Sequence, residues 1–282
     1  MRQLYICKED SMNLLIAKII KCAFVPFAVS ALLLASVGAQ TMSGYDIMKK
    51  ADEVERGNTS SYVATMTLIS KNGSTRVREI VSYKKDFADS KRSVVAFRTP
   101  KDVAGVSYLM WEYDEDANGN KKDRDSWLYM PAMKKVRRIS GSESGDDFMG
   151  TDFTYDDMGD RGLAKDTFTL LGEEAVNGFM CYKVECVAKD ATEKNPRRIM
   201  WVRKDNFMVQ RGEYYNKQNT LQRTLECENI QQIDNIWTTG KMTMKNVKTE
   251  HATVIEMKDV HYNQSIADSL FTVASLERGA IK

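Results

Sequence analysis

Hydrophobic and polar residues alternate with a period of two along most of the chain. The run 61–70 alternates, Asn72-Gly73 follows, and the run 75–84 alternates back. Asn-Gly between two alternating runs is the strongest short-range signal for a β-hairpin. A second Asn-Gly pair, at residues 177–178, lies between two more runs of the same kind. The pattern therefore predicts antiparallel strands that follow one another in the chain.

Alternating runs continue to residue 262 with few connections long enough for a helical crossover. We expect about eleven antiparallel strands, and a sheet of that size twists strongly and curls. Tyr108 and Met110 fall on one face of their strand, while Leu109 and Trp111 fall on the other. Because both faces are apolar, we expect a single large curved sheet whose concave face is covered by other parts of the chain.

Two segments outside the strands carry a helical pattern. Residues 44–56 place Ile47, Met48, Ala51 and Val54 on one stripe, which predicts a short amphipathic helix. A closing turn or short helix is expected within 265–277. The fold class is thus mainly β, with a few helices as a lid and the irregular middle segment beside them.

The N-terminal part of the chain has the features of a secretory signal peptide. Lys18 and Lys21 precede an apolar run over 22–35, and small or aliphatic residues lead to a cleavage site after Ala39. An N-terminal membrane anchor is the alternative, but the run of about 14 residues is shorter than the roughly 20 that span a bilayer. We expect Met12 to be the true start and the mature protein to reside in the periplasm.

Removal of residues 1–39 leaves 40–282, which we expect to form a single domain. The 41 basic and 39 acidic residues of the chain fall to 37 of each, because the leader carries four basic and two acidic residues. A balanced charge argues against a nucleic-acid partner, which would require a basic excess.

Three cysteines remain in the mature chain: Cys181, Cys186 and Cys227. Cys181 and Cys186 are five residues apart on one expected strand, so they face opposite sides and cannot bridge each other. Export to an oxidising compartment permits a disulfide from Cys227 to one of them. Burial of all three as small apolar side chains is an equally good interpretation.

One loop resembles the start of a calcium-binding loop. Asp114, Asp116, Asn118 and Gly119 follow the D-x-D-x-N-G pattern, with Asp125 at position 12. An EF-hand has a bidentate glutamate there and helices on both sides, whereas strands are expected here. We interpret the segment as a polar hairpin loop and leave calcium binding open.

No catalytic constellation accompanies these elements. His251 and His261 lack partners at metal-ligand spacing, and neither a nucleophile elbow nor a glycine-rich phosphate loop is present. We therefore expect no enzyme activity, no metal and no cofactor. A hydrolase or calcium-binding enzyme is the least favoured hypothesis.

Methionine is frequent on the expected strands, and fourteen of the sixteen follow Met12. Its flexible, polarizable side chain suits surfaces that accept varied apolar partners. An ordinary core is the simpler interpretation for any one methionine. Together with Trp127, Trp201 and Trp237, the set indicates an apolar cavity.

The stretch WLYMPAMKKVRRISGSESGDDFMGTDFTYDDM, residues 127–158, resembles the hallmark of the outer-membrane lipoprotein-sorting proteins, relatives of the periplasmic carrier LolA. The segments ADEVERG (51–57) and SLERG (275–279) are similar to the ends of that family. The matching positions are Trp127, Leu128, Tyr129, Pro131, Ala132, Lys134 or Lys135, Arg137, Arg138, Ile139, Phe148, Met149, Gly150, Asp152, Phe153, Tyr155 and Asp157.

The resemblance implies an unclosed β-barrel of about eleven strands with helices as a lid over a hydrophobic cavity. It also implies a periplasmic carrier that takes acyl chains of a lipid or lipoprotein towards the outer membrane. An inner-membrane RND-type exporter is the implied partner, and a monomer is expected. The lipid-binding candidates are Met66, Met110, Trp127, Tyr129, Met130, Phe148, Met149, Phe153, Tyr155 and Trp201.

Lys134, Lys135, Arg137 and Arg138 form a basic strand that we expect to contact a partner or a lipid headgroup. The alternative function is a periplasmic accessory module that docks on a lipid exporter and carries nothing. The two hypotheses differ in one structural requirement. A carrier needs space between sheet and lid that the protein's own side chains do not fill.

Overall fold

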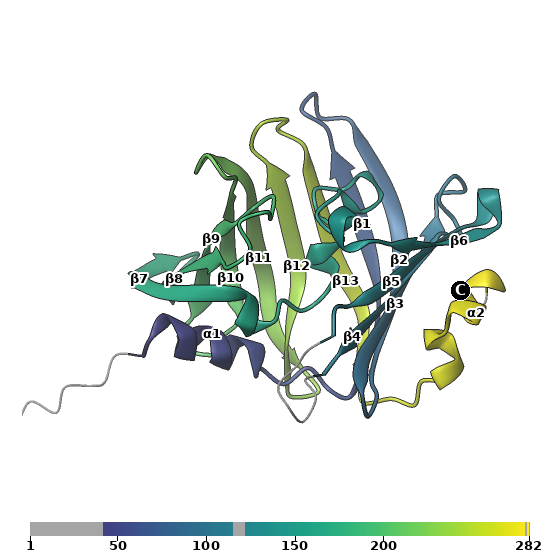
Figure 1. Ribbon diagram of the computed structural model, residues 1–282, viewed down its shortest axis with the longest axis horizontal. Helices are drawn as coiled ribbons and strands as arrows, with labels where there is room; N and C mark the ends of the chain where they lie inside the picture. The colour runs from purple at the N-terminus through teal and green to yellow at the C-terminus, as the bar shows by residue number, and fades with distance from the viewer. Residues whose placement is uncertain (1–41, 115–121, 280, 282) are drawn as a thin grey trace, which may run out of the picture. The chain divides into compact units, whose positions relative to one another are not determined.

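Antiparallel strands joined by short turns build one sheet in the computed structural model, which describes residues 42–114, 122–279 and 281 (Figure 1). Within these residues there are thirteen strands, two more than the sequence predicts. They are β1 (Thr59–Ile69), β2 (Thr75–Asp86), β3 (Ser90–Thr99), β4 (Ser107–Tyr113), β5 (Asp125–Met130), β6 (Lys135–Ile139), β7 (Asp166–Val176), β8 (Phe179–Ala188), β9 (Arg197–Arg203), β10 (Val209–Tyr215), β11 (Leu221–Ile233), β12 (Ile236–Asn246) and β13 (Ala252–Tyr262).

The strand order is β6-β5-β4-β3-β2-β1-β13-β12-β11-β10-β9-β8-β7. Every pair of neighbours is consecutive in the chain except β1 and β13, which join the two halves of the sheet by antiparallel pairing. The two edges are β6 and β7, which are consecutive in sequence but do not pair with each other. The predicted fold class, a mainly β protein with one unclosed antiparallel sheet, is confirmed.

Both predicted Asn-Gly hairpins are present. At the β7–β8 turn, Asn177 and Gly178 have φ of 50° and 85°, as a two-residue type I′ turn requires. Gly73 has φ of 82° in the turn between β1 and β2. These local turns fix which strands are adjacent, because neither leaves residues for a crossover.

The two faces of the sheet are both apolar, as the alternation on β4 predicts. Tyr108 and Met110 belong to one buried cluster, and Leu109 belongs to another on the opposite face. The first cluster also contains Tyr214 of β10, although six strands lie between β4 and β10 in the sheet. Strands so far apart can share a cluster only if this face curves inward, so we call it the concave face.

Helix α1 (Gly44–Asp52) is shorter than the predicted 44–56. Its first turn is closed by a capping box, in which Ser43 and Asp46 bond to each other's backbone N–H groups. Ile47 is completely buried and packs against Val184 and Val202 of β8 and β9. The helix thus covers the β7–β9 end of the sheet.

The C-terminal segment covers the opposite, outer face. It contains the 3₁₀ turn η6 (Asp268–Phe271) and helix α2 (Val273–Glu277), within the predicted 265–277. Phe271 and Leu276 are completely buried against strands that include β3 and β4. Among the described residues, no helix has both the length and the apolar character needed to cross a bilayer.

Candidate functional site

The chain must cross the sheet between β6 and β7, because these strands form its two edges. Residues 140–165 make this crossing, and we call them the plug. The plug contains the 3₁₀ turns η2 (Gly141–Glu143), η3 (Phe148–Gly150), η4 (Asp156–Met158) and η5 (Leu163–Lys165). It lies on the concave face (Figure 1).

Aromatic side chains of the plug pack into the concave face. Phe148, Phe153 and Tyr155 are 0%, 4% and 7% exposed. The ring of Phe148 lies 5.4 Å from that of Tyr108 on β4, and 5.5 Å from that of Tyr155. Edge-to-face pairs at this separation are favourable beyond the area they bury. The rings therefore occupy the space where the sequence predicts a cavity.

Beneath the plug the sheet presents a methionine-rich surface. Met66, Met110 and Met244 are each 1% exposed, and Met130 and Met242 pack against the same cluster. Where the plug aromatics pack, the protein's own side chains fill the space between sheet and plug. The surface itself is apolar, and the plug is the element that covers it.

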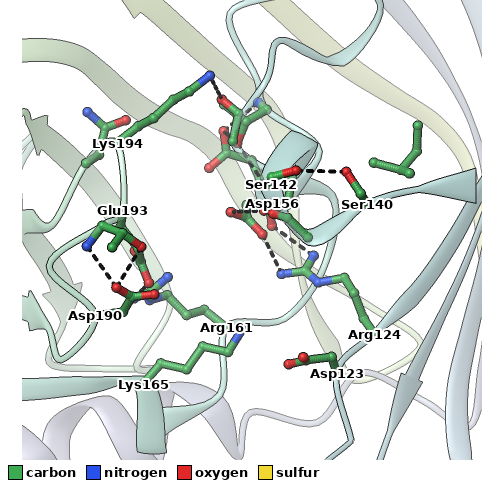
Figure 2. Close-up of a pocket in the computed structure, with 18 of the residues that line it drawn as sticks. Asp123, Arg124, Ser140, Ser142, Asp156, Arg161, Lys165, Asp190, Glu193 and Lys194 are labelled. Carbon is green, nitrogen blue, oxygen red and sulfur yellow. Dashed lines mark hydrogen bonds and ion pairs between the residues drawn. The ribbon is translucent and has the colours of Figure 1, made fainter.

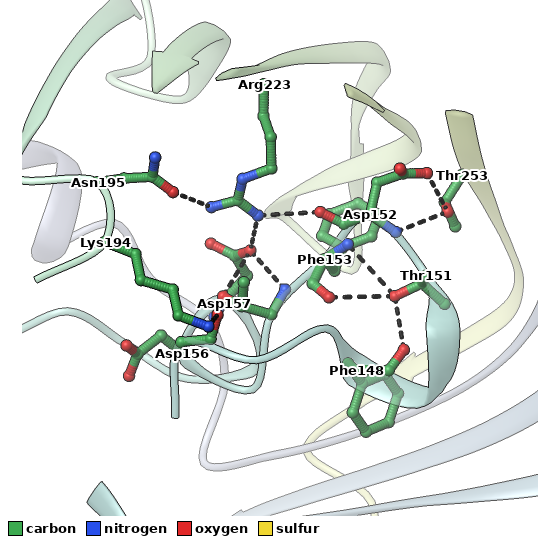
Figure 3. Close-up of polar contacts among 12 residues, drawn as sticks. Phe148, Thr151, Asp152, Phe153, Asp156, Asp157, Lys194, Asn195, Arg223 and Thr253 are labelled. Carbon is green, nitrogen blue, oxygen red and sulfur yellow. Dashed lines mark hydrogen bonds and ion pairs between the residues drawn. The ribbon is translucent and has the colours of Figure 1, made fainter. Parts of the chain in front are cut away.

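Polar contacts hold the middle of the plug to the sheet (Figure 3). Arg223 of β11 donates to the Asp152 carbonyl oxygen at 2.9 Å and to the Asp157 carboxylate at 2.6 Å. Thr253 of β13 donates its hydroxyl hydrogen to the Asp152 carboxylate at 2.7 Å and accepts the Asp152 N–H at 3.0 Å. Arg78 of β2 donates to the Met149 carbonyl oxygen at 2.8 Å. These bonds satisfy plug groups that have no strand partner.

The C-terminal part of the plug is anchored by charge. Glu112 accepts the Asp160 N–H at 2.8 Å, and the Asp160 carboxylate pairs with Arg56 at 2.5 Å and with Lys84 at 3.4 Å. Although burial acts to raise it, the pKa of Asp160 is lowered to about 2 by Arg56, Lys84 and Lys91. Burial, followed by the charge of Asp160, raises the pKa of Glu112.

The structure brings seven of the ten lipid-binding candidates into one cluster. Those seven, on the concave face or in the plug, are Met66, Met110, Met130, Phe148, Met149, Phe153 and Tyr155. The other three lie elsewhere. Trp127 and Tyr129 pack on the outer face beside the C-terminal segment, and Trp201 belongs to a separate cluster with Cys181. Their neighbours on β5 and β9 point to the concave face instead, because side chains alternate along a strand.

The basic candidates lie at the β5–β6 hairpin. Lys134 and Lys135 are exposed. Arg137 pairs with Glu143, and Arg138 pairs with Asp125. Two of the four cations are thus engaged within the protein, whereas Lys134 and Lys135 point to solvent.

The structure shows the state of the three cysteines of the expected mature chain. The described cysteines, Cys181, Cys186 and Cys227, are buried free thiols, as in the interpretation of small apolar side chains. Burial raises the pKa of Cys186 and Cys227 to about 12.

The signal peptide and most of the calcium-like loop, residues 115–121, lie outside the described residues. Within the described part of the chain, no three His, Cys, Asp or Glu side chains gather as metal ligands.

A polar pocket of about 740 Å³ opens beside the plug, and sequence reasoning did not find it (Figure 2). Its walls come from the plug, the β8–β9 loop, the concave face of β9–β11, the residues just before β5 and the end of β6. No local motif could have indicated it, because its residues come from segments far apart in the chain. They include Arg124, Ser144, Asp156, Asp157, Arg161, Lys165, Asp190, Glu193, Lys194, Arg198, Tyr214 and Arg223.

Comparison with known proteins supports the family resemblance. A family model described as "Uncharacterized protein" matches residues 89–278. The chain is 32% identical to a DUF1329 family protein from Desulfovibrio piger, with a TM-score of 0.77 over 83% of this chain and 97% of that chain. Among curated proteins, none matches.

Two further crystal structures share the fold. A putative outer membrane lipoprotein-sorting protein domain from Vibrio parahaemolyticus is 25% identical, with a TM-score of 0.76 over 83% of this chain and 98% of that chain. A LolA superfamily protein from Nitrosomonas europaea is 19% identical, with a TM-score of 0.63 over 83% of this chain and 99% of that chain. The predicted resemblance to lipoprotein-sorting, LolA-type proteins is confirmed.

Proposed function

This chain belongs to the DUF1329 family, and from that premise we propose that it is a periplasmic carrier of acyl chains. The cargo, a lipid or a lipoprotein, displaces the plug and lies on the methionine-rich concave face. The carrier takes the acyl chains across the aqueous compartment towards the outer membrane, and an RND-type exporter of the inner membrane is its proposed donor. Likeness to the lipoprotein-sorting domain of Vibrio parahaemolyticus supports this proposal.

The energetic need for such a carrier is large. One buried methylene contributes about 0.8 kcal/mol, so exposing a 16-carbon chain to water costs roughly 12 kcal/mol. A protein that covers the chain with an apolar surface removes that barrier. A plug that returns when the cargo leaves also keeps the same surface from water in the empty carrier.

The observation that carries the proposal is the way the concave face is covered. The plug has no strand or long helix, and its short 3₁₀ turns are held to the sheet by buried rings and side-chain bonds and not by a strand ladder. Met149 has a left-handed backbone with φ of 51°, which costs a non-glycine residue about 1 kcal/mol or more. The flexible methionines beneath can repack around a different apolar occupant.

Locking the plug tests the proposal. Asp152 and Thr253 touch through their side chains, so Asp152→Cys combined with Thr253→Cys places two thiols where a disulfide can tie the plug to β13. The purified double variant is incubated with lipid under reducing and under oxidising conditions, and native mass spectrometry with lipid extraction measures bound acyl chains. We expect the reduced double variant to carry lipid and the oxidised one to carry none.

The single variants Asp152→Cys and Thr253→Cys serve as controls for loss of the plug contacts themselves. Equal lipid content in the oxidised and reduced double variant would contradict displacement of the plug. Absence of acyl chains from the wild-type protein, both after purification and after incubation with lipid, would overturn the carrier function.

A second candidate function follows from the filled concave face. A protein that carries nothing would keep the plug in place and act through its surface, where Lys134 and Lys135 are exposed. The variant with both lysines changed to Glu tests this alternative, with Lys248→Glu as a control on a distant turn. Loss of exporter binding in a pull-down, together with the absence of bound lipid in the wild-type protein, would favour the docking module.

A further inference from the structure

Three side chains form a row across the concave face at one end of the polar pocket. Tyr214 of β10 is paired in register with Arg198 of β9 on one side and with Arg223 of β11 on the other. Residues directly opposite in antiparallel strands point to the same side of the sheet. Because Tyr214 belongs to the concave cluster, all three side chains point into the concave face, where they line the pocket.

The row is nearly buried, yet two of its donors have no acceptor. Tyr214 is 8% exposed, and its hydroxyl makes no hydrogen bond within the described residues. The Nε of Arg198 is buried and also lacks a partner. The buried Nε of Arg198 costs about 1–3 kcal/mol without an acceptor, and such groups are rare without a ligand or a water molecule. The Tyr214 hydroxyl is not one of the fully buried unpaired atoms, and its residue lines the pocket.

Arg198 pairs with the buried Asp166 through a terminal nitrogen, which leaves its Nε as the unused donor. Asp123 and Asp190 line the pocket without an ion pair in the described residues, but other pocket carboxylates are paired with cations.

Among the acidic side chains of the pocket, Asp156 pairs with Arg124 at 2.9 Å and Glu193 pairs with Arg161 at 2.9 Å. Lys165 also lines the pocket and makes no ion pair within the described part of the chain. The unused groups of the row and of Lys165 are thus all hydrogen-bond donors.

The plug already places one carboxylate against the row. Asp157 accepts from Arg223 at 2.6 Å and from the Thr154 N–H at 2.7 Å (Figure 3). Burial, followed by the charge of Asp157, raises the pKa of Tyr214. If the plug moves aside, Arg223 loses an anionic partner while Tyr214 and Arg198 remain on the sheet.

We propose that Arg198, Tyr214 and Arg223 form a binding site for a phosphate group, the headgroup of the amphiphile that the protein carries. Asp157 holds the same place in the closed state and leaves with the plug. This inference rests on the proposed carrier function and names its cargo class: an acyl chain joined to a phosphate. Two guanidinium groups around a hydroxyl donor suit the several oxygens of a phosphate.

Two amphiphiles that differ only in the phosphate test the site. The wild-type protein is titrated with palmitoyl lysophosphatidic acid and with palmitoyl monoacylglycerol, below their micelle concentrations, and with inorganic phosphate alone. We expect the phosphorylated amphiphile to bind at least ten-fold more tightly than the uncharged one. Tyr214→Phe keeps the ring and removes the donor, so it should weaken only the phosphorylated amphiphile, by about ten-fold.

Tyr215→Phe is the matched control, because the neighbouring residue on β10 points to the outer face and its hydroxyl donates to Glu213. It should leave both affinities unchanged. Equal affinity for the two amphiphiles, unaffected by Tyr214→Phe, would overturn the headgroup site while the carrier function stands.

The remaining outcomes separate the two proposals further. If inorganic phosphate binds as tightly as the phosphorylated amphiphile and monoacylglycerol does not bind, the site takes a free anion and both the headgroup assignment and the carrier function fail. If no probe binds the wild-type protein, the site and the carrier function are both rejected.

Discussion

The plug and the C-terminal segment cover opposite faces of the same strands, and they are held in different ways. Each buries a phenylalanine completely: Phe148 on the concave face and Phe271 on the outer face. Around Phe271 the contacts are mainly apolar, with Leu276 and Ile281 at 0% and 5% exposure. Around Phe148 the plug also buries Phe153 and Tyr155, and arginine, threonine and carboxylate bonds to neighbouring plug residues add to this apolar packing.

This difference separates a permanent cover from a removable one. Apolar burial is insensitive to a competing headgroup, whereas bonds to Arg223 and Thr253 can pass to another acceptor. The backbone–backbone hydrogen bonds of the plug join its own residues, except at Lys165 at its end, so the plug can open locally without breaking a strand ladder. The C-terminal segment, which is the outer cover, should therefore contribute to the global stability of the protein. The plug should open without unfolding of the sheet.

The largest expected effect is at Phe271. Phe271→Ala removes a buried ring that packs on Phe87 with ring centres 5.7 Å apart, and it leaves a cavity under the C-terminal segment. We expect the free energy of unfolding to fall by about 3–5 kcal/mol. Urea denaturation followed by tryptophan fluorescence measures it, and a loss below about 1 kcal/mol would show that this cover is removable too.

Phe148→Ala should cost less, although the ring is equally buried. The loss is limited by the free energy that opens the plug, because a weakened plug can undock while the sheet stays folded. We expect a fall of at most about 3 kcal/mol, with faster amide hydrogen exchange confined to residues 140–165. Exchange that accelerates equally in β1 and β13 would instead make the plug part of the global unfolding unit.

Asp160 should make the plug sensitive to acid. Its pKa of about 2 lies below the ordinary value of about 3.9, so its ion pairs stabilise the folded state above about pH 4 and lose that contribution as the pH falls towards 2. Asp160→Asn should cost about 2 kcal/mol at neutral pH. Urea midpoints measured from pH 7 to pH 2 should converge for the two proteins. A constant difference would exclude the carboxylate as the cause.

The smallest effect is expected at the polar contact of the outer cover. The Trp111 indole N–H donates to the Phe271 carbonyl oxygen at 3.0 Å, the counterpart of the Arg78 bond in the plug. Trp111→Phe should cost about 0.5–1.5 kcal/mol for the hydrogen bond, plus a smaller packing loss. Thermal unfolding compares it with Trp237→Phe as a control. A loss above 3 kcal/mol would mean that polar bonds hold both covers.

Local pattern was enough to predict the strands, both hairpins and the two apolar faces. Alternation along β4 separates Tyr108 from Leu109 whatever the rest of the molecule does, because successive side chains in a strand point to opposite sides. Turn chemistry at Asn177-Gly178 is equally local. Phe148 and Tyr155 became candidates through the family resemblance, and the structure places both in the concave cluster.

The orientation of the two faces and the filling of the concave face depended on the tertiary structure. Alternation says that two faces exist but not which one curves inward, so Trp127 and Tyr129 were grouped with Met130 although they lie on the outer face. Whether plug rings line a cavity or fill it depends on how closely the segment approaches the sheet. That approach is set by contacts such as Arg223 to Asp157, which join distant parts of the chain.

Sequence by itself thus determined the elements, their order and the family, because these follow from neighbours within a few positions. The pairing of β1 with β13, and the row that aligns Arg198, Tyr214 and Arg223, were decided only by the fold. Register between strands is a non-local property: it depends on the burial of whole faces and on turn lengths elsewhere in the sheet. The proposed phosphate site exists only because that register places two arginines beside one buried hydroxyl.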